Sequence, residues 1–173
     1  MLDAILTRRS VRRFEERRVE AEKLLEILKA AFFAPTAKNL RLCEFIVVQN
    51  IQMIEHLSLA TPYSSFAKDA PLIIVICYNE GKGRRFREDC AIASENIYLE
   101  ATNQGLGTCY VQICDGTEAD AGDPETYVKN LLGIPAGVRV LCLMPVGYPA
   151  AVPTPHTDAE YDTERVHMEL YGS

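Results

Sequence analysis

Two apolar segments constrain the fold more than any other feature of this sequence. The run LIIVICY, Leu72 to Tyr78, is almost unbroken, and VRVLCLMPV, Val138 to Val146, is similar. Consecutive apolar residues are typical of strands covered on both faces, because alternate side chains point to opposite sides of a sheet. We expect two more strands at Glu44 to Gln49 and at Thr108 to Ile113. The sequence therefore predicts a layered domain built on a covered sheet.

The segment from Glu20 to Phe33 predicts an amphipathic helix. Its charged residues fall opposite an apolar face that consists of Leu24, Leu25, Ile27, Leu28, Ala31 and Phe32. We expect the helix to end at Ala34, because the following Pro35 disfavours helical geometry in the residue before it.

Further helices are expected between the strands. Phe86 to Gln104 is compatible with a long, largely buried helix at the hub of the fold, ended by the glycines of Gly105-Leu106-Gly107. Shorter segments predict a first helix with Leu2, Ile5 and Leu6 at helical spacing, a helix over Ile51 to Leu59 with Ile51, Ile54, Leu57 and Leu59 inward, and a linker and helix within Glu118 to Leu132. This alternation of elements gives a mixed α/β or α+β layered domain. The glycine turn enters a strand from a helix, which is the opposite order to a dinucleotide-binding turn.

Length and charge narrow the class of protein. The 173 residues are the size of one domain, so residues 1–173 are expected to share one core. A formal net charge of -6 argues against nucleic-acid binding, which usually needs a basic face. The longest apolar run is far shorter than the ~20 residues that span a bilayer, and the first ten residues do not have the order of a signal peptide. We therefore expect a cytoplasmic protein with no membrane or nucleic-acid partner.

The stretch TRRSVRR, Thr7 to Arg13, concentrates four arginines around one hydroxyl, Ser10, in this acidic chain. Guanidinium groups and a hydroxyl match the oxygens of a phosphate, which favours a bound small anion. Arginine clusters near a terminus are also commonly solvated charge runs. Residue spacing alone does not choose between the two interpretations.

Other reactive residue types give weaker signals. The six cysteines form no C-x-x-C pair and the three histidines are isolated, so we expect reduced, buried thiols and no metal site. Asp89 is expected to be a solvated or capping residue and Asp115 a turn residue, while Tyr78 and Tyr110 are expected to pack. If the protein is an enzyme, a cofactor is therefore expected to supply the reactivity.

Six segments in this order resemble the nitroreductase family of FMN-dependent oxidoreductases. They read ILTRRSVRRF, AAFFAPTAKN, EFIVVQN, DAPLIIVIC, DCAIASENIYLEATNQGLGTCYV and LGIPAGVRVLCLMPVGYP, and they cover Leu2 to about Tyr148. The resemblance implies an α+β fold with a central mixed, mainly antiparallel sheet flanked by helices. It also implies a homodimer with a domain-swapped tail and with FMN at the interface.

The resemblance also implies which residues hold the cofactor. The FMN phosphate and ribityl chain would be bound by Arg8, Arg9, Ser10 and Arg12. The flavin ring would be covered by a loop of the other subunit, with Pro35, Thr36, Ala37 and Asn39. Beside the ring would lie Val111, Gln112 and Ile113, with a backbone N–H facing flavin N5.

Three departures from the family pattern bear on this site. Gln112 and Ile113 stand where many members carry glycines beside N5. Arg41-Leu42-Cys43 replaces the usual Gln-Pro-Trp after the loop. The lysine and arginine that often complete the phosphate site have no clear match between Pro155 and Glu160, and Arg165 is the nearest candidate.

The activity implied by the resemblance is an FMN-dependent oxidoreductase that uses NADH or NADPH. It would reduce a small nitroaromatic-like or quinone-like acceptor by ping-pong hydride transfer through flavin N5, with no catalytic side chain assigned. The alternatives are a flavin-binding carrier or sensor without efficient turnover, and a module that binds anions or nucleic acid through TRRSVRR.

Overall fold

The computed structural model describes residues 1–115 and 122–172, and its centre is an antiparallel sheet. The strands are β1 (Cys43–Val48), β2 (Leu72–Asn79), β5 (Val138–Gly147), β3 (Gly107–Thr108) and β4 (Val111–Gln112). Their order is β1-β2-β5-β3, and β4 also pairs with β5. Each of these strand pairs is antiparallel. The order places β2 and β5, the two apolar runs, in the middle of the sheet.

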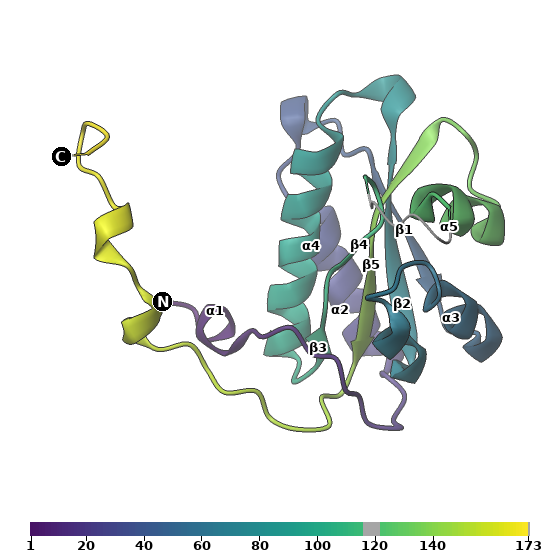
Figure 1. Ribbon diagram of the computed structural model, residues 1–173, viewed down its shortest axis with the longest axis horizontal. Helices are drawn as coiled ribbons and strands as arrows, with labels where there is room; N and C mark the ends of the chain where they lie inside the picture. The colour runs from purple at the N-terminus through teal and green to yellow at the C-terminus, as the bar shows by residue number, and fades with distance from the viewer. Residues whose placement is uncertain (116–121, 173) are drawn as a thin grey trace.

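Helices cover both faces of this sheet (Figure 1). They are α1 (Asp3–Thr7), α2 (Ala21–Phe32), α3 (Ile51–Leu57), α4 (Phe86–Asn103) and α5 (Pro124–Leu132). Alternate residues of β2 serve the two layers: Ile74 belongs to the core cluster that contains residues of α2 and α4, and Ile73 to the cluster that contains residues of α3 and α5. The α+β class is confirmed, and so is the central position of α4, which contacts α2 and most of the sheet.

The predicted strand over Thr108 to Ile113 is wrong in one respect. The chain forms two short strands, β3 and β4, separated by Cys109 and Tyr110. The tyrosine's backbone N–H donates to the Tyr98 hydroxyl at 2.6 Å and so leaves the ladder. The predicted linker before α5 starts in residues 118–121, which lie outside the described residues.

Several apolar side chains that were expected to point inward are exposed in the single chain. In α3, Ile54 and Leu57 are buried, but Ile51, in the first turn, is exposed. Leu59 is also exposed, because the helix ends at Leu57. In α2, Leu25 and Phe32 are exposed although Ile27 and Ala31 are buried. The apolar stripe of α2 is therefore wider than the surface that α4 and the sheet cover.

The two terminal segments extend from the lower end of the sheet to its left side in Figure 1, where both termini lie. The N-terminal stretch crosses the end of α4 beside β3, and the segment after β5 leads into an extended tail that lies away from the sheet. Almost all of the tail is exposed. Among the described residues, none of the helices is both long and apolar enough to cross a membrane.

Candidate functional site

The arginine stretch lies against the edge of the sheet. Ser10 forms an isolated parallel bridge with Thr108, and the Val11 N–H donates to the Thr108 carbonyl at 2.9 Å. Gly107 permits this approach, because a Cβ at that position would lie 2.7 Å from the Cβ of Val11. The glycine that ends the turn after α4 is thus required for close packing of the two segments.

Tyr98, on α4, joins the arginine stretch to the sheet edge. Its hydroxyl lies 3.3 Å from Ser10 Oγ and accepts from the Tyr110 N–H at 2.6 Å. The Arg8 guanidinium lies 5.2 Å from the centre of the Tyr98 ring. Burial raises the pKa of Tyr98, so the phenol is neutral at physiological pH. No periodic pattern marks a single tyrosine in a buried helix, and the residue was missed in the sequence.

The predicted arginines have different partners. Arg9 is bound to the tail, where it donates to the carbonyls of Thr154 at 2.8 Å and Pro155 at 3.2 Å and pairs with Glu160 at 3.0 Å. Within the described part of the chain, no ion pair engages Arg8 or Arg12. The side chains with donors left for an anion are therefore those of Arg8 and Arg12, beside the Ser10 hydroxyl.

The tail approaches this cluster through His156. Its backbone N–H donates to the Leu6 carbonyl at 2.7 Å, and its Nε2 lies 3.4 Å from an Arg8 nitrogen. Its Nδ1 lies 2.6 Å from the Glu160 carboxylate. That contact, together with the Thr157 N–H and Arg9, lowers the pKa of Glu160 to about 2. The Glu160 carboxylate thus joins His156 to Arg9 and adds to the backbone contacts that hold the tail against the arginine stretch.

Arg165 is not brought to the cluster. It pairs with Asp162 at 2.9 Å within its own turn of the tail, and its side chain is 85% exposed. In this chain the predicted replacement for the missing basic pair therefore lies apart from Arg8 and Arg12.

The three predicted ring-contacting residues lie on β4 and just after it. The Ile113 N–H donates to the Leu141 carbonyl at 2.9 Å, on the β5 side. Successive N–H groups of an extended strand point to opposite sides, so the Val111 N–H also faces β5 and the Gln112 N–H faces the open edge. Gln112 is therefore the one of the three whose backbone donor is directed away from the sheet.

The predicted loop at Pro35 to Asn39 has an unusual backbone. Lys38, Asn39 and Arg41 have φ values of 54°, 54° and 52°, a region that residues other than glycine rarely adopt. Local side-chain bonds support it: Arg41 donates its backbone N–H to Thr36 Oγ1 at 3.0 Å and its side-chain Nε–H to Asn39 Oδ1 at 2.9 Å. Three strained residues in one loop are typical of a functional segment.

Asp89 fixes this loop from below, which corrects the expectation of a solvated or capping residue. It is 3% exposed, and its Oδ1 accepts from the Ala37 N–H at 2.9 Å. Its Oδ2 is buried and has no hydrogen-bond partner among the described residues. Asp89 is buried because the loop, which lies about 50 residues earlier in the sequence, packs over the first turns of α4.

The loop and the arginine stretch do not meet in one chain. The loop is held by Asp89 and the arginine stretch by Tyr98, nine residues further along α4. Nine residues advance a helix by about 13 Å and make about two and a half turns, so side chains at this spacing point in opposite directions. The two sets of predicted residues therefore lie on opposite sides of α4.

Comparisons with known proteins agree with the motifs. The family model described as the nitroreductase family matches residues 5–61 and 50–148. A protein of Methanothermobacter thermautotrophicus, named provisionally as an NADH dehydrogenase/NAD(P)H nitroreductase, is 36% identical over 174 residues, which cover 99% of this chain and 87% of that protein. The FMN reductase (NADPH) of Bacillus subtilis is 26% identical over 170 residues, covering 86% of this chain and 66% of that enzyme.

Among solved structures, an FMN-dependent nitroreductase from Clostridium difficile has a TM-score of 0.95 and 35% identity, with 99% of this chain and 100% of that chain covered. The nitroreductase fold is thus confirmed over the sheet, its helices and the tail. On the family match, the sequence identity and the fold together, the chain belongs to the nitroreductase family.

Proposed function

We propose that the protein is an FMN-dependent oxidoreductase that transfers a hydride from NADH or NADPH to a small nitroaromatic-like or quinone-like acceptor. The observation that carries this proposal is the position of two donor sets along one edge of the sheet. Ser10, which lies between Arg8 and Arg12 in the chain, is bridged to Thr108 of β3, and the Gln112 N–H is directed outward from β4. Thr108 and Gln112 are four residues apart, a span of at most about 14 Å.

The donor chemistry fits FMN. The guanidinium groups of Arg8 and Arg12, for which no ion pair is present among the described residues, and the Ser10 hydroxyl can form hydrogen bonds to a phosphate monoester, charge-assisted in the case of the arginines. The buried Thr108 Oγ1, next to the Ser10 bridge, has no partner among the described residues and adds one more polar atom at this edge. Beyond it, Val111 and Ile113 are buried in the core, which fixes the backbone of this segment.

Each residue then has a defined task. We assign the phosphate to Arg8, Ser10 and Arg12, with Tyr98 holding the serine and stacking near Arg8. FMN, when bound, supplies a ring that takes up a hydride at N5 and gives it to an acceptor. The Gln112 N–H is the donor assigned to the N5 side of the ring, where a fixed dipole stabilises developing negative charge. Arg9 and Arg165, both in ion pairs here, remain predicted contacts.

We further propose a homodimer in which the ring is covered by the partner's loop of Pro35, Thr36, Ala37 and Asn39. The separation of the loop and the arginine stretch on opposite sides of α4 supports a site made from two chains. Exposed apolar side chains on α2 and along the tail support a partner surface for a domain-swapped tail. We place this single-domain protein, residues 1–173, in the cytoplasm, without a nucleic-acid or membrane partner.

Purified protein tests the proposal. An enzyme is yellow, and its flavin absorbance bleaches on addition of NADH or NADPH and returns when an acceptor such as a quinone is added. A yellow protein that does not bleach is a flavin carrier or sensor. A colourless protein that takes up no added FMN contradicts both.

A further inference from the structure

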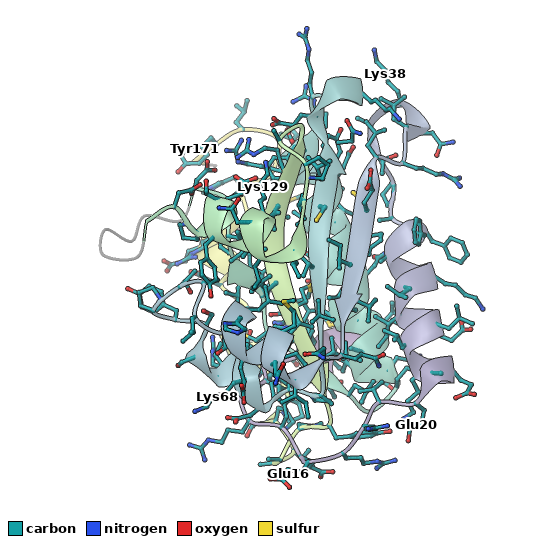
Figure 2. All side chains as sticks on the ribbon, turned by 90° about the vertical axis from the view of Figure 1, so that its right-hand side faces the viewer. Glu16, Glu20, Lys38, Lys68, Lys129 and Tyr171 are labelled. Atoms are coloured by element: carbon teal, nitrogen blue, oxygen red, sulfur yellow. The ribbon has the colours of Figure 1, made fainter. Side chains whose placement is uncertain are left out.

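A second charged surface lies at the other end of the molecule from the arginine stretch. A hollow of about 840 Å³ is formed between the loop after α2 and the turn between β2 and α4, and it is lined by Ala37, Lys38, Leu40 and residues 80–85. Lys38 marks this end in Figure 2, opposite Lys68.

The lining is strongly basic. It contains the four cations Lys38, Lys82, Arg84 and Arg85, in a chain whose net charge is -6. Its one carboxylate, Glu80, is paired with Arg139 at 3.0 Å and so is already neutralised. Arg85 pairs with Glu88 at 3.1 Å, while Lys38, Lys82 and Arg84 have no ion-pair partner in the described ranges. Three cations on one wall that have no ion-pair partner among the described residues produce a positive potential that attracts anions.

The hollow shares the strained loop with the proposed flavin site. Lys38, with φ of 54°, belongs to the loop whose neighbours Ala37 and Asn39 are assigned to the partner's flavin ring. The Ala37 N–H is fixed by the buried carboxylate of Asp89, so Lys38 is held on a rigid support. A ligand in the hollow therefore lies next to whatever reaches the ring.

We propose that this basic hollow binds the phosphate groups of an organic anion that exchanges electrons at the flavin. This inference rests on the proposed flavin site, and it adds the chemical class of the ligand that reaches the flavin. Arg84 and Arg85 supply forked donors that match phosphate oxygens, and Lys38 and Lys82 add mobile charges at the rim. The phosphates belong either to the nicotinamide nucleotide or to an anionic acceptor.

The test compares two double charge reversals in FMN-loaded protein. K82E/R84E alters the hollow, while R18E/K68E makes the same change in charge at exposed positions outside it. We expect inorganic pyrophosphate, titrated by calorimetry, to bind the wild type and R18E/K68E but at least about tenfold more weakly to K82E/R84E, with FMN content unchanged. Equal binding to all three proteins, or no binding to the wild type, overturns the proposal.

Kinetics distinguish the source of the phosphates. A KM for NADH or NADPH that rises about tenfold in K82E/R84E, with kcat within about twofold, assigns the hollow to the nucleotide. A rise confined to a phosphorylated quinone, relative to its neutral parent, assigns it to the acceptor. Unchanged KM values for all these substrates overturn the role at the flavin. Because pyrophosphate can also be titrated without FMN, a protein that fails to bind flavin contradicts the proposed function separately.

Discussion

Tyr98 Oη lies 3.3 Å from Ser10 Oγ, 88 residues away in the chain. The same oxygen accepts from the Tyr110 N–H at 2.6 Å, so one buried phenol connects the arginine stretch, the hub helix and the segment between β3 and β4. The geometry of the proposed phosphate site therefore depends on a residue that need not touch the cofactor.

Replacing this phenol by Tyr98→Phe is expected to weaken FMN binding about tenfold. The change frees Ser10 and leaves the Tyr110 N–H without its acceptor, a loss of about 1–3 kcal/mol. FMN fluorescence quenching measures the affinity, and circular dichroism checks that the fold is retained. The exposed Tyr63→Phe serves as the matched control, and equal affinities for the two variants would contradict the positioning role.

Removing the two free guanidinium groups should have a larger effect. In R8A/R12A we expect FMN affinity to fall by about 3 kcal/mol, on the order of hundredfold, since two charge-assisted contacts are lost. R13A/R18A removes the same charge from exposed positions and should leave affinity nearly unchanged. Unaltered FMN retention in R8A/R12A would show that the phosphate lies elsewhere.

Gly107 should tolerate no side chain while Val11 is present. In Gly107→Ala, the new Cβ would be 2.7 Å from the Val11 Cβ, so the arginine stretch must move away from β3. We expect a loss of about 1–3 kcal/mol in stability and weaker FMN binding. The double variant G107A/V11A removes the contacts with the two Val11 methyl groups, which include the closest one, and leaves only the contact with Cβ. It should therefore recover part of the affinity, measured by the same quenching titration. If Val11→Ala brings no recovery, crowding against the Val11 methyl groups is not the cause.

The central sheet was predictable because both faces of β2 are covered. A strand that is buried on both faces has apolar residues at nearly every position, and such a run is visible in the sequence. It indicated less well what depends on contacts distant in sequence. Asp89 was expected to be a solvated or capping residue, since carboxylates near the start of a helix usually have one of these roles. Its burial requires the loop at Ala37 to fold over it. Sequence spacing carries no record of that contact.

Surface apolar residues show a related limit. Helical periodicity placed Leu25 and Phe32 with the buried residues of α2, yet both are exposed in the single chain. Helical spacing identifies the apolar face of a helix, but it does not show whether the same chain or a partner covers each residue of that face. The sequence likewise showed that the tail lacks the usual basic pair. It did not show that His156 of the tail contacts Arg8.

The tail contact should depend on pH through Glu160. Hydrogen bonding from His156 first, then from Thr157 and Arg9, lowers the pKa of Glu160 to about 2, below its ordinary 4.5. A carboxyl with a depressed pKa stabilises its contact fully above the ordinary value and loses that contribution as pH falls toward the depressed one. We therefore expect the tail to stay attached at neutral pH and to loosen between pH 4.5 and 2.

A fluorophore at Tyr171→Cys can report this release, because the six native thiols are buried. Anisotropy should fall between neutral pH and acid, whereas Glu160→Gln should show a lower value than the wild type at pH 7 and a smaller further fall, since the contacts of Arg9 with the Thr154 and Pro155 carbonyls remain. Glu164→Gln, outside the His156 contacts, is the control. Identical pH profiles for the wild type and Glu160→Gln would exclude Glu160 as the attachment.

Mixed dimers test whether each site takes residues from two chains. One parent carries R8A/R12A, which disables the phosphate contacts. The other carries Asp89→Ala, which removes the acceptor that holds Ala37 and so releases the loop.

Each parent homodimer has two defective sites and should bind FMN weakly. In a mixed dimer with shared sites, both defects fall in one site, because the loop of the Asp89→Ala chain covers the R8A/R12A stretch of its partner. The other site is then intact, so tandem-tagged mixed dimers should retain about one FMN per dimer. If loop and arginine stretch instead acted within one chain, the mixed dimer would contain two damaged sites and bind no more FMN than the parents.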